Sequence, residues 1–216
     1  VAVDIAFDSS AQDSQSIIHL ECDLTDLQNI QQTINESDRL GFKITDVIQA
    51  AYPRTQDWGA GIQELKKDSL DQNFSMQLSS LILSTRELTN YLLRNKGGSV
   101  VFVGSIQGVG APKFDHYEKS NFVSPVEYSV IKAGTISLTK YLAKYYFNKG
   151  LRFNCVSPGG ILDDQDQEFL TRYRSVCNSV GMLDPKDVAD AVSFLLSSSA
   201  ARITGQNLIV DDGWSL

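Results

Sequence analysis

The sequence predicts an α/β fold: a doubly wound parallel sheet of the Rossmann type, in three layers (α/β/α). Short apolar runs recur along the chain, and longer amphipathic stretches separate them. The runs lack the polar alternation of half-exposed strands, which is typical of parallel strands covered on both faces. The strands are predicted at residues 1–6, 17–21, 45–50, 99–104, 151–156 and 208–210.

The stretches between these runs have recognisable helix ends. Thr25 is placed to cap a helix that runs to Gly41. Asp184 followed by Pro185 puts a good N-cap before a proline at the first helical position. Strands that alternate with helices through right-handed crossovers place the ligand site beyond the carboxyl ends of the strands.

Composition favours one domain over residues 1–216 that acts on a small molecule. A chain of 216 residues is long enough for one sizeable core. The net charge of −7, with scattered Lys and Arg, argues against nucleic-acid binding. The apolar stretches are shorter than the roughly 18 residues of a membrane-spanning helix. The three cysteines lack ligand spacing, so we expect free thiols in a reducing, cytoplasmic setting and no required metal.

Tyr128 and Lys132 are the candidate acid/base pair. They stand four residues apart near the start of the helical run after Pro125, so both side chains project from one helix face. The pattern is weak by itself, because Tyr145 and Lys149 repeat it. Tyr145 lies at the far end of the same run, where a solvated or interface face is the simpler interpretation.

Three other features become informative in combination. Ser105 directly follows a predicted strand, where its hydroxyl would face the crevice, although alone it is also a common turn residue. Asn73 lies in a helical run over residues 70–93, where it either faces solvent or joins a buried network. The turn at residues 157–160 (Ser-Pro-Gly-Gly) either lets the backbone approach a flat ligand or is an ordinary loop.

In this order the features resemble the short-chain dehydrogenase/reductase family over the whole chain. The resemblance implies a catalytic tetrad of Asn73, Ser105, Tyr128 and Lys132. Residues 203–206 (Ile-Thr-Gly-Gln) and 210–213 (Val-Asp-Asp-Gly) match the C-terminal strand signature of that family. It implies an oxidoreductase that transfers hydride between a nicotinamide cofactor and a carbonyl/alcohol pair.

A narrower resemblance is to the flagellin-modification protein A branch of that family. Residues 51–54 (Ala-Tyr-Pro-Arg), 111–114 (Ala-Pro-Lys-Phe) and 211–216 (Asp-Asp-Gly-Trp-Ser-Leu) carry it. These bacterial oxidoreductases are associated with the synthesis of sialic-acid-like sugars such as legionaminic acid. The resemblance implies a phosphorylated, amino or nucleotide-linked sugar as substrate, in surface or flagellin glycan biosynthesis.

The resemblance also implies how the cofactor is held. Asp4, at the end of the second strand of the family fold, would accept hydrogen bonds from the adenosine ribose and repel a 2′-phosphate. We therefore expect NAD(H) to be preferred and NADP(H) to be possible; Asp8 is close enough to be mistaken for Asp4. The expected cofactor-binding residues are Asp4, Asp23, Leu24, Ala50, Ala51, Tyr128, Lys132, Pro158, Gly159 and Ile161.

The sequence departs from the family pattern in three places. Residues 49–52 (Gln-Ala-Ala-Tyr) replace the Asn-Asn-Ala-Gly segment, so Tyr52 is a candidate to line the site. The interval from Ser105 to Tyr128 is long, and residues 113–124 form either a substrate-contacting loop or a plain surface insertion. The glycine-rich pyrophosphate turn is not in the sequence, so we expect about 25 to 30 further residues before Val1, with a first strand and that turn.

The resemblance assigns each tetrad residue a role in reduction. Tyr128 donates a proton to the carbonyl oxygen, Ser105 holds that oxygen, and Asn73 joins a water relay from Lys132. A phenol is a poor base at neutral pH, so a cation is needed nearby. At about 4 Å and an effective dielectric of about 20, Lys132 would contribute about 4 kcal/mol, or about three pKa units.

Two other functions remain open at this point. One is a sugar-nucleotide epimerase or dehydratase of the extended group, which keeps its cofactor bound through turnover but carries an added C-terminal substrate domain. The other is a non-catalytic dinucleotide-binding redox sensor. Net turnover of NADH would indicate an oxidoreductase, because neither of these two alternatives consumes the cofactor. By resemblance, the helices at residues 70–93 and 125–149 would also pack against symmetry mates in a homodimer or homotetramer.

Overall fold

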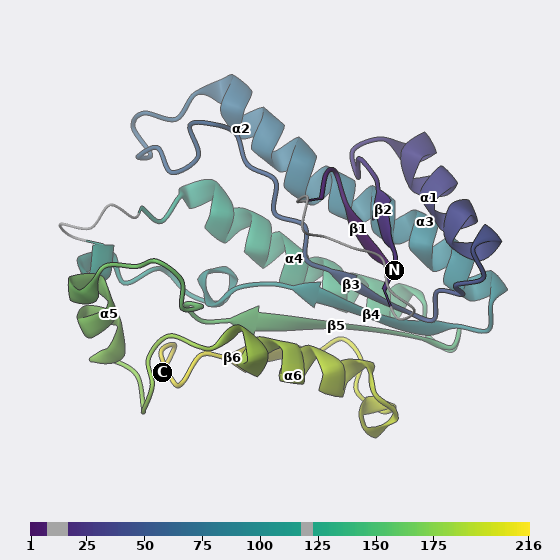
Figure 1. The fold of residues 1–216 in the computed structure, drawn as a ribbon. Helices are drawn as coiled ribbons and strands as arrows, with labels where there is room; N and C mark the ends of the chain where they lie inside the picture. Colours follow the sequence, from purple (N-terminus) through teal and green to yellow (C-terminus); the bar gives the residue numbers. More distant parts are fainter. Residues whose placement is uncertain (8–16, 118–122) are drawn as a thin grey trace.

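The computed structural model describes residues 1–7, 17–117 and 123–216 (Figure 1). Asp8 and the insertion residue Lys119 lie outside these ranges. The strands are β1 (Ala2–Asp4), β2 (His19–Glu21), β3 (Asp46–Gln49), β4 (Gly98–Val103), β5 (Leu151–Pro158) and β6 (Asn207–Val210). The α-helices are α1 (Leu27–Arg39), α2 (Lys67–Phe74), α3 (Ser80–Arg94), α4 (Val126–Tyr145), α5 (Gln167–Arg174) and α6 (Pro185–Leu196).

All six predicted strands are present, and every strand pairing is parallel, which confirms the α/β class. Within the described ranges the strands form two sheets rather than one: β1 pairs with β2, and the larger sheet has the order β3-β4-β5-β6. Apolar runs identify strands, but they do not identify which strands become neighbours. The division between β1 and β3 was therefore not predicted.

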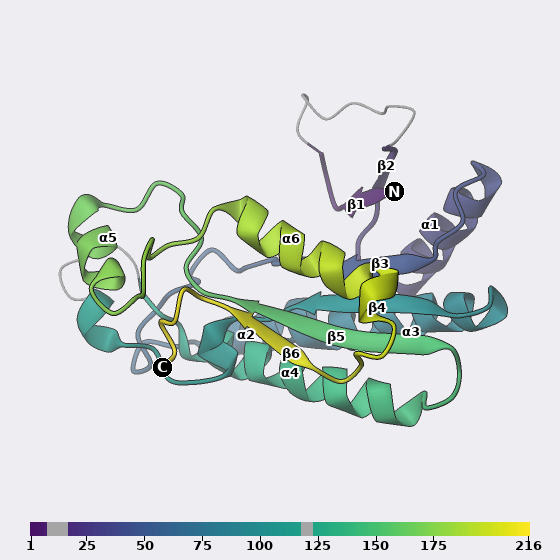
Figure 2. The same ribbon diagram turned by 90° about the horizontal axis from the view of Figure 1, so that it is seen from below.

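Helices cover both faces of the larger sheet, in three layers (Figures 1 and 2). On one face, α1, α3 and α4 enclose a core that includes Leu92, Phe102 and Phe153. On the other face, α6 packs on the sheet through Val188, Val192 and Leu195. Nearly every residue of β5 is buried, as expected for a central parallel strand with helices on both sides.

Local signals set the helix ends, with one correction. Asp184 caps α6 as predicted: its side chain accepts from the backbone N–H of Lys186, and Asp187 completes a capping box. Helix α1, however, is capped by Asp26 and not by Thr25. The Thr25 hydroxyl instead donates to Asp23 Oδ1 at 2.7 Å, so it does not cap the N–H groups at the start of α1.

The helical run predicted over residues 70–93 is not uniform. Helix α2 ends at Phe74, a π-helical turn covers Ser75–Ser79, and α3 begins at Ser80. Such π turns inside helices often occur at functional sites. Asn73 lies two residues before the turn begins and is almost completely buried.

The structure also has short 3-10 turns at the carboxyl end of the sheet. Ile106–Gly108 directly follows Ser105, and Phe114–Tyr117 begins the inserted segment. A third cluster of buried side chains, formed by Ile106, Phe169, Tyr173 and Trp214, lies beside these turns. No helix among the described residues is long and apolar enough to cross a membrane.

Candidate active site

Ser105, Tyr128 and Lys132 converge at the carboxyl end of β4. Tyr128 and Lys132 project from the first two turns of α4, whose start is set by Pro125 in an extended conformation. The Ser105 side chain lies close enough to the Tyr128 hydroxyl to affect its pKa, and its Oγ accepts from the backbone N–H of Gln107 at 3.2 Å. The three polar groups therefore meet because a strand end and a helix start are packed together.

Gly108 makes this close packing possible. A Cβ atom at this position would lie 2.6 Å from the backbone carbonyl carbon of Lys132 and 2.8 Å from the backbone nitrogen of Ala133. Any side chain would therefore push α4 away from the turn that follows Ser105. Sequence reasoning did not single out Gly108, because a glycine in a turn is common and its contact with α4 is not visible in the sequence.

A cavity of about 220 Å³ opens next to Tyr128 and Lys132. Its lining is Ala50, Tyr52, Val103, Gly104, Tyr128, Lys132, Pro158, Gly159 and Ile161. The structure thus brings together Ala50, Tyr128, Lys132, Pro158, Gly159 and Ile161 from the expected cofactor-binding set. Tyr52, suggested by its unusual position after β3, lies in the same wall.

A larger cavity, of about 540 Å³, lies against the face of α5 that carries Leu170 and Arg174. Its lining is otherwise formed by Leu162, Gln167, Thr171, Ser175, Val180 and Met182. It contains no Tyr, His, Lys or carboxylate for proton transfer. The smaller cavity is therefore the candidate catalytic site, despite its size.

Lys132 is a buried ammonium group with one strong acceptor. Its Nζ donates to the backbone oxygen of Val103 at 2.8 Å, and only 8% of the residue is exposed. Burial lowers the pKa of Lys132 to about 8, and the nearby Cys155 thiol opposes this shift slightly. The side chain can therefore change its charge within the working pH range of many enzymes.

Burial also controls Tyr128, in the opposite direction from the sequence-based expectation. Desolvation raises the pKa of Tyr128, and the interaction with the Ser105 side chain opposes this rise without reversing it. The predicted lowering by Lys132 does not prevail, because the same burial disfavours both the phenolate and the ammonium. The Lys132 Nζ lies 5.6 Å from the centre of the Tyr128 ring.

Asn73 joins a buried network rather than facing solvent, but its partner is unexpected. Its Oδ1 accepts from the backbone N–H of Thr55 at 3.1 Å, and its Nδ2 donates to the Thr55 hydroxyl at 3.1 Å. The side-chain amide is thus bound to the loop between β3 and α2. Sequence reasoning missed Thr55 because no local signal links it to Asn73.

The loop after β3 brings an aromatic group to Tyr128. The ring centres of Tyr52 and Tyr128 are 5.5 Å apart, and that of Trp58 lies 5.6 Å from Tyr52 and 6.3 Å from Tyr128. All three pairs meet edge to face, which is a favourable arrangement for aromatic rings. Trp58 was also missed, since an isolated tryptophan in a loop has no periodicity to interpret.

The first part of the inserted segment lies near the same site. Gln107 donates to the Tyr117 hydroxyl at 2.9 Å and accepts from the Ser124 hydroxyl at 2.7 Å. Burial raises the pKa of Tyr117, and the charge of the nearby Tyr128 raises it further. The described part of the insertion therefore includes a residue near the catalytic pair, while Phe114 is 64% exposed.

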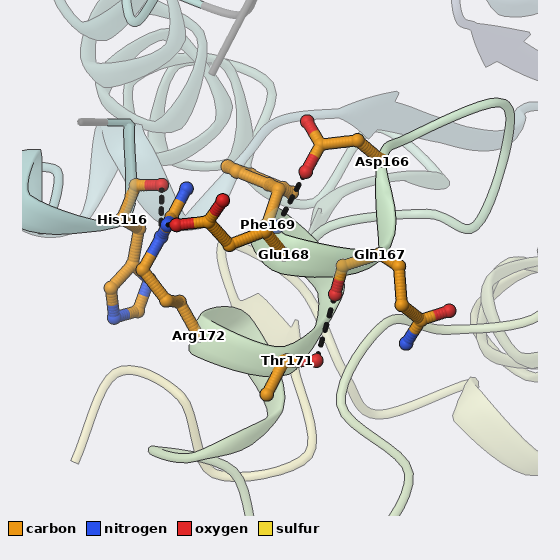
Figure 3. A network of polar contacts seen from close by, with 7 residues as sticks. All are labelled: His116, Asp166, Gln167, Glu168, Phe169, Thr171 and Arg172. Carbon is orange, nitrogen blue, oxygen red and sulfur yellow. Dashed lines mark hydrogen bonds and ion pairs between the residues drawn. The ribbon is translucent and has the colours of Figure 1, made fainter. Parts of the chain in front are cut away.

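His116 anchors the insertion to α5 (Figure 3). Its backbone oxygen accepts from Arg172 Nε at 3.1 Å, and Arg172 also donates to Glu168 Oε1 at 2.5 Å. The His116 ring is buried beside Tyr173 and Trp214, and this burial lowers the pKa of the imidazole. His116 is therefore part of a packed support and does not line the catalytic cavity.

The same support reaches the Pro-Gly turn. The backbone N–H of Gly160 donates to the Tyr173 hydroxyl at 2.6 Å, and the Tyr173 ring stacks on Trp214 with centres 5.8 Å apart.

Near the C-terminus, Asp212 accepts from the backbone N–H groups of residues 179–181, which lowers its pKa to about 2. Sequence reasoning singled out the C-terminal motif but not this contact.

The remaining cofactor candidates lie outside the cavity. Asp4 ends β1 and is exposed, and its Oδ1 accepts from the backbone N–H of Ile5 at 2.7 Å. Asp23 accepts two hydrogen bonds from Thr25, which lower the pKa of its carboxyl. Leu24 packs against the main core, and Ala51 is exposed next to the cavity wall formed by Ala50 and Tyr52.

Tyr145 is not part of this site. It is the last residue of α4, it is 66% exposed, and its ring stacks on Tyr141 with centres 5.8 Å apart. The structure therefore separates the two Tyr-x-x-x-Lys matches as the sequence analysis did.

Comparisons with known proteins agree with this arrangement. A family model described as enoyl-(acyl carrier protein) reductase matches residues 6–215. Post-translational flagellin modification protein A of Campylobacter coli is 37% identical over 203 residues, which are 94% of this chain and 79% of that protein. A 3-oxoacyl-[acyl-carrier-protein] reductase of Rickettsia bellii is 29% identical over 199 residues, or 89% and 74% of the two chains.

A solved structure has the same fold. The crystal structure of a short-chain dehydrogenase from Leptospira borgpetersenii, with bound NAD+, gives a TM-score of 0.88 at 27% identity and covers 99% of this chain and 82% of that chain. The protein belongs to the short-chain dehydrogenase/reductase family and is an oxidoreductase. Within that family, the resemblance to the flagellin-modification protein A branch is confirmed.

Proposed function

We propose that the protein transfers hydride between NAD(H) and a carbonyl/alcohol pair on a sugar derivative. The observation that carries the proposal is the convergence of Tyr128, Lys132 and the Pro158-Gly159 turn on one cavity, with Ser105 close enough to Tyr128 to affect its pKa. Such a transfer needs an acid/base group, a cation and a backbone segment that a flat ring can approach, all at one strand end.

The chemistry of the cavity fits the nicotinamide end of the cofactor. An ammonium group has three donors, and Lys132 uses one of them on Val103, so two remain for ribose hydroxyls. The cavity of about 220 Å³ is smaller than the roughly 300–1,000 Å³ of most ligand pockets, so it suits one end of a dinucleotide and not the whole. The bound cofactor supplies or accepts the hydride.

The protein groups handle the proton and the carbonyl oxygen. The Tyr128 hydroxyl donates a proton to the developing alkoxide during reduction and removes it during oxidation. Ser105 holds the same oxygen, since its side chain lies close to the Tyr128 hydroxyl. Asn73 contributes to a water relay from Lys132, and its side-chain amide, although bound to Thr55, keeps one N–H and one lone pair for water.

Asp4 supports a preference for NAD over NADP. Its exposed carboxylate at the end of β1 has lone pairs left for ribose hydroxyls and would repel a 2′-phosphate. Asp23 and Leu24, which follow β2, lie beside the adenine in this proposal. The NAD+ in the Leptospira enzyme is consistent with the same choice of cofactor.

The flagellin-modification relative supports a sugar derivative in bacterial surface or flagellin glycan biosynthesis as substrate. We further propose one domain over residues 1–216, a cytoplasmic location and a homodimer or homotetramer. Exposed aromatic side chains at the end of α4, Tyr141 and Tyr145, support an assembly face there.

A substrate screen tests the proposal. The full-length protein would be incubated with NADH and keto-sugars, or with NAD+ and sugar alcohols, while the absorbance of the reduced cofactor is followed. We expect net turnover with at least one sugar. Product formation without net cofactor turnover would point to an epimerase or dehydratase, and cofactor binding without any product would point to a redox sensor.

A further inference from the structure

The loop between β3 and α2 is held in place beside the start of α4 (Figure 1). In its middle, the backbone N–H of Thr55 donates to Asn73 Oδ1, and the Thr55 hydroxyl accepts from Asn73 Nδ2. Farther along, Asp57 accepts from the Ser69 hydroxyl at 2.7 Å and lies 3.6 Å from Lys66 Nζ. These contacts fix a loop that would otherwise be determined only by its flanking elements.

This fixed loop places a second cation near the catalytic pair. The Arg54 guanidinium carbon lies 5.1 Å from the centre of the Tyr52 ring, and Lys132 Nζ lies 5.5 Å from the same centre. Arg54 and Lys132 therefore both lie close to the same aromatic ring. Lys132 belongs to the proposed reaction, whereas Arg54 does not.

Arg54 is available to a ligand. Its side chain is exposed and makes no hydrogen bond or ion pair with any residue in the described ranges. The acidic group whose charge acts on Tyr52 is Glu127, but Glu127 is only 2% exposed. A guanidinium with five donors and no partner among the described residues suits an external anion.

We propose that residues 52–58 form a substrate subsite in which Arg54 binds an anionic group, a carboxylate or a phosphate, on the sugar. Tyr52 and Trp58 provide the apolar surface against which the sugar ring lies. Asn73 acts as a positioning residue for this subsite through Thr55. The inference rests on the proposed function, because it assumes that the reacting sugar is bound at Tyr128.

The subsite gives a role to an arginine that has no partner among the described residues and lies against Tyr52, a residue of the cavity wall, in a protein of net charge −7. Arginine binds carboxylates and phosphates through two parallel hydrogen bonds, which a neutral sugar cannot accept as strongly. A neutral sugar would therefore leave Arg54 bound to water and gain little from it. The expected preference is for acidic over neutral sugars of similar size.

Binding of three sugars tests the proposal without relying on turnover. Isothermal titration calorimetry on the full-length protein, with saturating NAD+ to occupy other phosphate-binding groups, would compare glucose 6-phosphate, glucuronate and glucose. We expect at least one acidic sugar to bind at least tenfold more tightly than glucose. The stronger of the two identifies a phosphate or a carboxylate as the group that Arg54 binds.

Two arginine variants make the test specific. Arg54→Gln should remove the preference for acidic sugars, whereas Arg202→Gln should retain it. Arg202 is also exposed, but it precedes β6 and lies at the opposite end of the sheet from the cavity. The proposal is overturned if glucose binds as tightly as both acidic sugars, if neither acidic sugar binds, or if Arg54→Gln keeps the preference.

Two threonine variants test the positioning role of Asn73. Thr55→Val removes the hydroxyl that accepts from Asn73, and Thr55→Ser keeps it. We expect Thr55→Val to weaken acidic-sugar binding several-fold relative to glucose, and Thr55→Ser to restore it. If Thr55→Val and Thr55→Ser bind acidic sugars equally well, Asn73 does not position this subsite. Binding of acidic sugars through Arg54, together with a substrate screen that yields no turnover of any sugar, would refute the proposed reaction and leave the subsite standing.

Discussion

Lys132 donates a hydrogen bond of 2.8 Å to the backbone oxygen of Val103, which joins helix α4 to the last residue of strand β4. This contact holds a buried cation at the strand end where Ser105 and Tyr128 meet. Among the described residues this is the one hydrogen bond that the Lys132 ammonium group makes, so burial leaves its charged form costly.

The cost of this buried cation predicts a pH-dependent effect on stability. The pKa of Lys132 is about 8 in the folded protein, against about 10.4 for an exposed lysine. The charged form is disfavoured by folding, so the penalty is present below pH 8 and disappears as the pH rises from 8 to about 10.4. Relative to Lys132→Met, the wild-type protein should gain about 3 kcal/mol of unfolding free energy over that window.

Urea unfolding of both proteins at several pH values measures this gain. The methionine does not titrate, so the other ionisable groups cancel in the difference between the two proteins. A difference that stays constant from pH 7 to pH 10.5 would contradict the lowered pKa of Lys132.

Tyr128→Phe should abolish turnover while preserving the fold. The change removes the acid/base hydroxyl and keeps the ring that packs against Tyr52, and such groups contribute about 10² to 10⁴ in rate. Tyr145→Phe is the matched control, because Tyr145 has the same spacing to a lysine but is exposed at the end of α4. Steady-state rates with saturating cofactor should stay within a few fold for Tyr145→Phe. If Tyr128→Phe kept more than about a tenth of the wild-type rate, the catalytic assignment would be wrong.

Asp4→Ala should reduce the preference for NAD over NADP. Removing the carboxylate eliminates acceptors for the ribose hydroxyls and the repulsion of a 2′-phosphate. Values of kcat/KM for NADH and NADPH measure the change, and Asp46→Ala serves as an exposed acidic control at the start of β3. If the ratio of kcat/KM for NADH to that for NADPH is the same in the wild type and in Asp4→Ala, Asp4 does not set the cofactor preference.

Asp184→Ala should destabilise the protein by about 1 kcal/mol, because it removes the capping box of α6. Asp190→Ala removes the same charge from the same helix, where it breaks only an exposed ion pair with Lys186, and should cost less than about 0.5 kcal/mol. Thermal or urea unfolding compares the two variants. If both variants lose the same unfolding free energy, the negative charge and not the capping box of Asp184 stabilises the start of α6.

Much of the fold could be predicted from the sequence because its signals are local. Each strand is marked by its own apolar run, and the cap of α6 by two adjacent residues, Asp184 and Pro185. The pairing of Tyr128 with Lys132 follows from the helix period alone. The cap of α1 was misassigned by one residue, because Thr25 and Asp26 are both good caps and only their hydrogen bonds separate them.

The sequence by itself thus determined the α/β class, the strand positions and the placement of Tyr128 and Lys132 on one helix face, since each depends on residues a few positions apart. The tertiary structure decided the rest: Asn73 bonds to Thr55, 18 positions away, and Trp58 meets Tyr128 across the site. It also decided that Lys132 has a lowered pKa and Tyr128 a raised one, because burial depends on every element packed around a side chain. Contacts between distant segments leave no periodic trace in one sequence, and desolvation exists only once those segments are assembled.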